Sequence, residues 1–190
     1  VLGMVYPDSF IPLAEKTGQI LAIGEWVLKQ VCQQIHLWEN AGYYIIPIAV
    51  NISVKQLEQP GFAKMVADIM RSNYIKPSYI ELEITESVSS GNLVTIVNNI
   101  KELKKNGIKI SMDDFGTGFS SLGQLDIFEL DKLKIDKIFI GDLVDSIKRQ
   151  KLVKSIIAMA KSLQLMVVAE GIETNEQLNQ LKLLGCQYGQ

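Results

Sequence analysis

Short strand-like and helix-like segments alternate along most of this chain of 190 residues. Residues 79–86 alternate between apolar and polar side chains with a period of two, which is typical of a strand. Residues 165–169 are continuously apolar, as in a strand of a parallel sheet, whereas residues 93–105 carry apolar side chains at helical spacing. Strands that alternate with helices in this way lie parallel in one sheet, and the helices cross over its faces. The order of segments therefore predicts an α/β fold with a parallel sheet.

The expected elements can be given as residue ranges. Strands are expected over residues 47–52, 79–86, 109–112, 132–136 and 165–169, and helices over residues 9–18, 23–40, 55–72, 93–105 and 146–163. Ser9 is expected to cap the first helix and Thr174 a last one. One face of the helix at residues 23–40 is expected to carry Trp26, Val27, Gln30, Val31, Ile35 and Trp38.

Successive strand–helix units follow one another at a short distance in the sequence, and no glycine-rich dinucleotide fingerprint is present. Both features favour a barrel over a doubly wound sheet. A complete barrel of this kind has eight strands and about 250 residues, whereas about five strand–helix units can be recognised here. We therefore expect a TIM-like (β/α) barrel that is incomplete at both ends. On this interpretation residues 1–190 form one truncated domain.

Composition excludes several classes of protein. The formal net charge of −2 argues against a nucleic-acid-binding surface, which is normally basic. No apolar run approaches the roughly 18 residues of a membrane span. Cys32 and Cys186 lie far apart among apolar neighbours, so we expect free, buried thiols in a reducing compartment. These features predict a cytoplasmic domain without membrane contact of its own, and they leave open an anchor elsewhere in the full-length protein.

Two adjacent carboxylates, Asp113 and Asp114, stand where the strand at residues 109–112 is expected to end. Glycine, threonine and serine are frequent in residues 116–121, which is typical of a mobile, hydrogen-bonding turn. Two carboxylates this close repel each other unless a cation or a proton lies between them. The pair is therefore either an Asx turn that leaves a strand or part of a binding site, and the other strand ends must decide.

Polar side chains also occur at the ends of the other expected strands. These residues are Asn51, Glu83 with Glu86, Lys134 with Asp136, and Glu170. Each alone has an ordinary explanation as a turn residue, a solvated side chain, a salt bridge or a helix-start acid. In a barrel, however, the carboxyl ends of the strands meet at one rim, and acids that converge there must be paired or must bind a metal.

The available ligands at these strand ends are oxygen atoms, with no cysteine or histidine among them. Oxygen ligands suit Mg²⁺ or Mn²⁺ and argue against zinc. The one histidine, His36, falls within an expected helix and is interpreted as a core-edge or solvated residue. Several carboxylates beside Lys134 could hold two metal ions about 3.5–4 Å apart, as in sites that cleave phosphodiesters. In such a site one aspartate bridges both ions, and the lysine orients the attacking water or helps to deprotonate it.

These residues resemble the EAL-domain cyclic di-GMP phosphodiesterases over essentially the whole chain. The matching stretches are Phe10-Ile11-Pro12-Leu13-Ala14-Glu15, Val50-Asn51-Ile52-Ser53, Glu81-Leu82-Glu83-Ile84-Thr85-Glu86-Ser87, Asp113-Asp114-Phe115-Gly116-Thr117-Gly118-Phe119-Ser120-Ser121, Lys132-Leu133-Lys134-Ile135-Asp136 and Val168-Ala169-Glu170-Gly171-Ile172-Glu173-Thr174. Together these stretches are highly specific, and only the Phe-Ile-Pro-Leu segment would be weak alone.

The resemblance implies a role for each residue of the constellation. Asn51, Glu83 and Asp113 are expected to bind one divalent cation. Asp113, Asp114 and Glu170 are expected to serve the second, directly or through water, with Lys134 beside the attacking water. Gln190 and Asp136 are assigned to substrate binding. Glu86 is expected to anchor the loop from Phe115 to Ser121, which is linked in the family to dimer contacts and activation.

The substrate that the resemblance implies is cyclic di-GMP, opened to the linear dinucleotide pGpG in bacterial second-messenger signalling. It also implies a homodimer of the full domain, and sensory or GGDEF-type domains in the same full-length protein. The Glu-Ala-Leu triplet that names the family, with the arginine after it, belongs upstream of Leu2 and is absent from this sequence. The closing strand expected after Gln190 is absent as well. Because the missing glutamate is itself a metal ligand in the family, this polypeptide alone is expected to be poorly active.

Three hypotheses therefore stay open. The first is a phosphodiesterase, and the second is a cyclic di-GMP receptor that does not hydrolyse its ligand. An intact Glu-Ala-Leu upstream favours the enzyme, and a substituted triplet favours the receptor. The third is an unrelated Mg²⁺ barrel enzyme acting on enolisable acids, which would not carry the Asp-Asp-Phe-Gly-Thr-Gly sequence.

Overall fold

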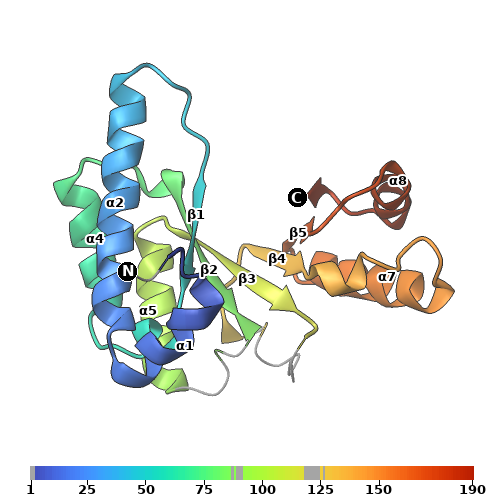
Figure 1. Ribbon diagram of the computed structural model, residues 1–190, viewed down its shortest axis with the longest axis horizontal. Coiled ribbons are helices and arrows are strands. Elements are labelled where there is room, and N and C mark those ends of the chain that lie inside the picture. The colour runs from blue at the N-terminus through green and yellow to red at the C-terminus, as the bar shows by residue number, and fades with distance from the viewer. Residues whose placement is uncertain (1–2, 87, 89–91, 118–124, 126) are drawn as a thin grey trace. The chain divides into compact units, whose positions relative to one another are not determined.

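The computed structural model describes residues 3–86, 88, 92–117, 125 and 127–190, and its chain divides into two compact units (Figure 1). The first unit comprises residues 1–82 and 90–109, and the second comprises residues 83–89 and 110–190. Strand β2 (Ile80–Thr85) contributes its first half to one unit and its second half to the other. Each described strand is hydrogen-bonded to its neighbours in sequence, in the order β1-β2-β3-β4-β5-β6.

The first unit is mainly helical. Its elements are α1 (Pro7–Thr17), α2 (Ile20–Asn40), β1 (Ile48–Ile52), α3 (Val54–Leu57), α4 (Phe62–Ser72), the 3-10 helix η1 (Pro77–Tyr79), the start of β2, and α5 (Leu93–Lys105). Helix α2 contacts α4, and α4 contacts α5, so that the three helices stand alongside one another next to β1 (Figure 1). Leu28, Val66 and Leu103, one from each helix, are fully buried in this core.

The expected face of α2 is only partly buried: Ile35 is buried and Val31 is half-buried, but its tryptophans are exposed. Trp26 is 61% exposed and Gln30 is also exposed, whereas Leu28, Cys32 and Ile35 form the buried stripe. These three positions are spaced i, i+4 and i+7, which is helical spacing as good as that of the tryptophan face. The apolar residues of α2 are distributed over several sides of the helix, so its sequence alone does not show which side is buried. Packing against α4 selects the stripe with the smaller side chains.

Two expected helix boundaries in the first unit are also wrong. The single helix expected over residues 55–72 is broken into α3 and α4, because Pro60 lacks a backbone N–H and Gly61 adopts a left-handed φ of 82°. Helix α1 begins at Pro7, before the expected cap at Ser9, since proline is well suited to the first turn of a helix.

The second unit contains the remaining strands. Its elements are the end of β2, β3 (Lys109–Phe115, from Ile110 on), β4 (Lys132–Ile135), the 3-10 helix η3 (Lys137–Phe139), α7 (Ile147–Ser162), β5 (Met166–Ala169), α8 (Asn175–Leu184) and β6 (Tyr188–Gly189). Strands β3, β4, β5 and β6 pair in parallel, and α7 packs against β5 and α8. Thr174 caps α8 as expected, because its hydroxyl accepts a hydrogen bond from Gln177 N. These pairings confirm the parallel α/β class.

Both cysteines are free thiols, as expected, but only Cys32 is fully buried and Cys186 is half-buried. Burial raises the pKa of the Cys32 thiol to about 11 and also raises the pKa of Cys186. Among the described helices, none has both the length and the apolar character that crossing a membrane requires.

Candidate metal centre

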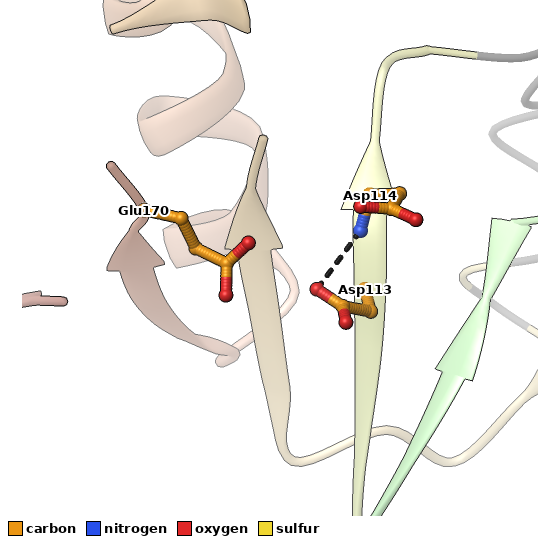
Figure 2. A group of neighbouring side chains, drawn as sticks. All are labelled: Asp113, Asp114 and Glu170. Carbon is orange, nitrogen blue, oxygen red and sulfur yellow. Dashed lines mark hydrogen bonds between the residues drawn. The ribbon is translucent and has the colours of Figure 1, made fainter. Parts of the chain in front are cut away.

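Asp113 and Asp114 occupy a bulge in β3. Met112 pairs with Leu133 and Phe115 pairs with Ile135, so two residues of β3 lie opposite a single residue of β4. Side chains alternate between the faces of a regular strand, and adjacent carboxylates would point in opposite directions. The bulge removes this alternation, and Asp114 adopts a left-handed φ of 54°, which aspartate tolerates better than most residues. The Asp114 N–H donates to Asp113 Oδ1 at 3.0 Å (Figure 2).

Lys134 lies among three carboxylates at the centre of the second unit. Its Nζ is 2.6 Å from Glu170 Oε1, 2.8 Å from Glu83 Oε1 and 3.1 Å from Asp113 Oδ1. Lys134 is only 5% exposed and Glu83 is 7% exposed. The contact between Lys134 and Glu83 shows that their side chains lie on the same face of the sheet. One buried ammonium therefore contacts three acids that come from three different strands or strand ends.

The cluster of Lys134 and its surrounding carboxylates has a net negative charge. Burial alone would lower the pKa of Lys134, but hydrogen bonds to Glu170 and Glu83 and the charges of the nearby carboxylates raise its pKa above the ordinary value. Burial, the charge of Asp113, a hydrogen bond with Asp136 and the charges of Asp136 and Glu170 together raise the pKa of Asp114 to about 6. A single lysine thus leaves part of the acid charge without compensation.

The donor set fits a hard divalent cation. One carboxylate oxygen from each of Asp113, Asp114 and Glu170 lies within 4.8 Å of the others. Ligands of Mg²⁺ or Ca²⁺ lie about 2.0–2.6 Å from the ion, so oxygens this close together can share one. Figure 2 shows the carboxylates of Asp113 and Glu170 facing each other across the strand between them. Among the described residues, no histidine or cysteine belongs to this group.

The structure brings Glu86 and Asp136 to the same part of the second unit. Glu86 is buried, and its Oε2 accepts a hydrogen bond from Gly116 N at 3.0 Å, directly after β3. Asp136 caps η3 by accepting from Ile138 N at 2.7 Å, and its side chain reaches Asp114. Residues 118–121 of the predicted loop lie outside the described residues, so the anchoring role of Glu86 stays a prediction.

Two predicted site residues, Gln190 and Asn51, are exposed. The backbone N–H of Gln190 donates to Ala169 O, and its carbonyl accepts from Ile172 N, while its side chain is exposed. Asn51 lies near the carboxyl end of β1 in the first unit and is also exposed. Their roles stay predictions.

Sequence reasoning missed Asp131, which lies immediately before β4. Its Oδ2 accepts from Ile110 N at 2.8 Å, and its own N–H donates to Ile110 O. Asp131 therefore holds the start of β3 in register with β4. An aspartate directly before an alternating strand is the signal that could have identified it. The bulge at Asp113 and Asp114 was missed as well, because it is visible only in the pairing of two strands.

Comparison with known proteins gives one consistent result. The EAL domain family model matches residues 1–190. The chain is 40% identical over 184 residues to MucR of Pseudomonas aeruginosa, a bifunctional diguanylate cyclase/cyclic di-GMP phosphodiesterase, covering 97% of this chain and 27% of that protein. It is 36% identical over 185 residues to the cyclic di-GMP phosphodiesterase NbdA of the same organism, covering 97% and 24%. The chain spans about a quarter of the length of the curated relatives it matches.

The solved structures agree with this result. The structure of the MucR phosphodiesterase in complex with c-di-GMP superposes with a TM-score of 0.89 at 40% identity, covering 98% of this chain and 76% of that one. The EAL domain of Mycobacterium smegmatis DcpA gives a TM-score of 0.82 at 34% identity, covering 87% and 75%. These similarities confirm the TIM-like fold class expected from the sequence.

Proposed function

Because this chain belongs to the EAL domain family, we propose that it forms the catalytic part of an enzyme that hydrolyses cyclic di-GMP to linear pGpG. The contact of Lys134 with Glu83, Asp113 and Glu170 carries this proposal. A buried lysine held by three carboxylates and flanked by Asp114 is an expensive arrangement for a hydrophobic core. It is well suited to a site that binds divalent cations and a phosphodiester.

The residues that would hold the cations come from the cluster and from the sequence match. Asp113, Asp114 and Glu170 would hold one ion, and Glu83 and Asp113 would share a second with Asn51, which is included on the sequence match alone. Bound Mg²⁺ or Mn²⁺ would polarise a phosphoryl oxygen and lower the pKa of a bound water. The identity of the ion as Mg²⁺ or Mn²⁺ and the presence of two ions are part of the proposal.

The other side chains of the cluster orient the reactants. Lys134 keeps Glu83, Asp113 and Glu170 in fixed positions with its three N–H donors. Its positive charge beside the phosphate would favour the deprotonated form of the attacking water. Asp136 and Gln190 would contact the substrate. Glu86 would hold the segment after β3 through Gly116 N.

Several features of the whole protein belong to the same proposal. Residues 1–190 would be part of one domain of the EAL type, working as a homodimer in the cytoplasm. Sensory or GGDEF-type domains would lie in the same full-length protein, in keeping with the bifunctional name of MucR.

The proposal is tested by turnover of cyclic di-GMP in the full-length protein. With Mg²⁺ or Mn²⁺ present, chromatography should detect pGpG, and Asp113→Asn should lower the rate by at least a hundredfold, since it removes a charge shared by both proposed metal positions. The exposed Asp145→Asn in the same unit is the matched control and should retain full activity.

Wild-type turnover in Asp113→Asn would disprove the assignment of the metal site. Tight binding of cyclic di-GMP without any turnover in the wild-type protein would instead support the receptor hypothesis.

A further inference from the structure

The 3-10 helix η3 of the second unit lies against the two chain segments that carry Asp114 and Glu170. Gly171 directly follows Glu170, and Gly116 follows Asp114 by two residues. Gly171 and Gly116 both adopt a left-handed φ, of 68° and 94°. Each faces η3 so closely that an added Cβ would collide with it. One short element therefore contacts the chain beside two members of the candidate metal group.

The ring of Phe139 makes the contact with Gly116. A Cβ at Gly116 would lie 2.7 Å from Phe139 Cζ, much closer than a normal contact between carbon atoms. Phe139 is 7% exposed, and the guanidinium carbon of Arg149 in α7 lies 5.2 Å from its ring centroid. Gly116 lies inside a hydrogen-bonded turn, because the N–H and the hydroxyl of Thr117 donate to Asp114 O at 3.3 and 2.9 Å. The position of Gly116 against the ring therefore constrains the backbone of Asp114.

Lys137, at the start of η3, makes the contact with Gly171. A Cβ at Gly171 would lie 2.5 Å from Lys137 Cβ and 3.4 Å from Lys137 Cα. Neither atom is the movable end of a side chain, so only a shift of the backbone could relieve the collision. The residue before Gly171 is also held, since the N–H of Glu170 donates to Ile135 O at 3.0 Å. The end of β4 and the start of η3 thus place Glu170 together.

η3 is itself held at both ends. At its start, Asp136 caps the helix and hydrogen-bonds to Asp114. Directly after it, the buried side chain of Gln177 in α8 donates to Ile140 O and Gly141 O, each at 3.3 Å. η3 is therefore a fixed support beside the carboxylates rather than a loose connection.

We propose that η3 positions the carboxylates of Asp114 and Glu170 for a divalent cation. Phe139 and Lys137 are then positioning residues that act through the two glycines. The inference rests on the proposed function, which assigns both acids to a metal ion. Substitution of groups behind metal ligands typically changes metal affinity by about 10- to 100-fold. The hydrogen bond to Glu86 is a separate support, because its loss would leave both contacts with η3 in place.

The test is the Mn²⁺ affinity of the full-length protein, measured from the electron paramagnetic resonance signal of free Mn²⁺. Gly116→Ala and Gly171→Ala should each weaken binding by about tenfold or more, because the added methyl group pushes the segment beside a ligand away from η3. Gly185→Ala in the same unit is the matched control. Gly185 also adopts a left-handed φ, of 85°, but its added Cβ would meet only the movable Nζ of Lys161. This variant should bind Mn²⁺ within twofold of wild type.

A double-variant cycle tests the contact with Phe139 itself. Phe139→Leu removes the ring atoms that an added Cβ at Gly116 would meet. Gly116→Ala should therefore cost less Mn²⁺ affinity in the Phe139→Leu background than in wild type, by at least about twofold. The strain of the left-handed φ is present in both backgrounds and cancels. If the two losses simply multiply, Phe139 does not position Gly116 and the proposal is wrong.

Asp113→Asn separates this inference from the function on which it rests. It should weaken Mn²⁺ binding at least as strongly as either variant beside η3. If it does so while Gly116→Ala or Gly171→Ala stays within twofold of wild type, the positioning role is wrong and the metal assignment stands. The same conclusion follows if Gly185→Ala weakens binding equally. If Asp113→Asn leaves the affinity unchanged, the metal assignment is wrong and the positioning role falls with it.

Unfolding midpoints in EDTA report on the fold separately. A purely structural role of η3 would lower the midpoint and leave the Mn²⁺ affinity of the folded protein unaltered. Should Gly116→Ala or Gly171→Ala prevent folding, Phe139→Leu alone carries the comparison and should weaken Mn²⁺ binding more than twofold. Leu181→Ala, which opens a cavity at a buried residue of α8 in the same unit, should not. Wild-type affinity in Phe139→Leu would then overturn the proposal.

Discussion

Lys134 shows at the scale of one residue why this cluster could bind a further cation. Its ammonium contacts three carboxylates that are all largely withdrawn from water. Removing one partner from a buried charge pair usually costs about 3–5 kcal/mol, because the remaining charge is left without compensation. Here the group is unbalanced from the start, since Asp113, Asp114, Glu83 and Glu170 share one lysine. A divalent cation bound to this cluster would supply the missing positive charge.

Glu86 gives a prediction that separates loop position from metal binding. Glu86→Ala removes the acceptor of Gly116 N, so the segment after β3 loses a fixed point directly beyond Asp114. We expect turnover of cyclic di-GMP to fall roughly tenfold to a hundredfold, as misplacement of a reacting group by about 1 Å can cause. Metal affinity should stay within twofold of wild type, because Glu86 is not among the proposed ligands. Steady-state kinetics and Mn²⁺ titration measure the two effects.

Two variants make this prediction specific. Glu86→Gln keeps an oxygen acceptor and should retain more activity than Glu86→Ala. Glu129→Ala removes an exposed glutamate of the same unit and should have no effect on turnover. Unchanged turnover in Glu86→Ala would exclude the anchoring role.

Helix α2 carries a prediction at the scale of secondary structure. Leu28 is 1% exposed and Trp26 is 61% exposed, although both are large apolar residues on one helix. Leu28→Ala should lower the free energy of unfolding by about 2–5 kcal/mol, because it leaves a cavity between packed helices. Trp26→Ala should change it by less than about 1 kcal/mol, in the range of surface substitutions. Urea denaturation of both variants measures the difference, and equal losses would disprove the buried stripe through Leu28, Cys32 and Ile35.

The elements also show how far the sequence can predict this structure. The sequence placed Glu83 and Lys134 at the ends of two expected strands, and the structure brings the two side chains into contact, because the carboxyl ends of parallel strands meet at one edge of a sheet. The bulge that turns Asp114 toward Glu170 depends on the register between β3 and β4, which no local pattern contains. The core face of α2 could not be predicted for the same reason. Several faces of that helix are apolar, and only its neighbours decide which one is buried.

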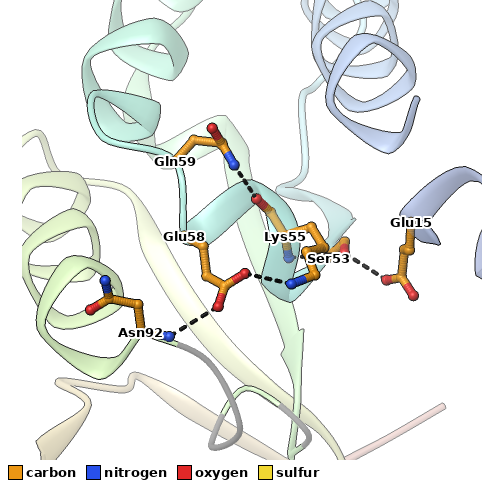
Figure 3. Close-up of polar contacts among 6 residues, drawn as sticks. All are labelled: Glu15, Ser53, Lys55, Glu58, Gln59 and Asn92. Atoms are coloured by element: carbon orange, nitrogen blue, oxygen red, sulfur yellow. Dashed lines mark hydrogen bonds and ion pairs between the residues drawn. The ribbon is translucent and has the colours of Figure 1, made fainter. Parts of the chain in front are cut away.

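Hydrogen-bonded turns of the first unit were the contacts least predictable from the sequence. The match of the Phe-Ile-Pro-Leu segment included Glu15, but nothing in its spacing indicated a partner 38 residues away at Ser53 (Figure 3). The capping box of Ser53 and Gln56 is a sequence pattern in principle. The expectation of a single helix over residues 55–72 hides this pattern, because the break at Pro60 and Gly61 shortens α3 to four residues.

At the scale of the whole molecule, metal binding should contribute to the stability of the fold. An ion that binds only the folded state stabilises it by RT ln(1 + [L]/Kd), or about 2.7 kcal/mol when its concentration is 100 times Kd. For a domain of about 150–250 residues, each kcal/mol raises Tm by roughly 2–4 °C. Saturating Mg²⁺ or Mn²⁺ should therefore raise the unfolding midpoint by several degrees, and EDTA should reverse the change.

The distribution of this stabilisation along the chain provides the stricter test. Hydrogen exchange should slow in β3, β4 and β5 on addition of metal, because these strands or their ends carry Asp113, Lys134 and Glu170, whereas exchange in α4 should change little. Asp113→Asn should abolish both the shift in Tm and the local protection, and Asp145→Asn should preserve them. A shift in Tm that survives in Asp113→Asn would mean that the ion binds elsewhere on the protein. The cluster around Lys134 would then have to be explained without a metal, as a set of acids balanced by one lysine.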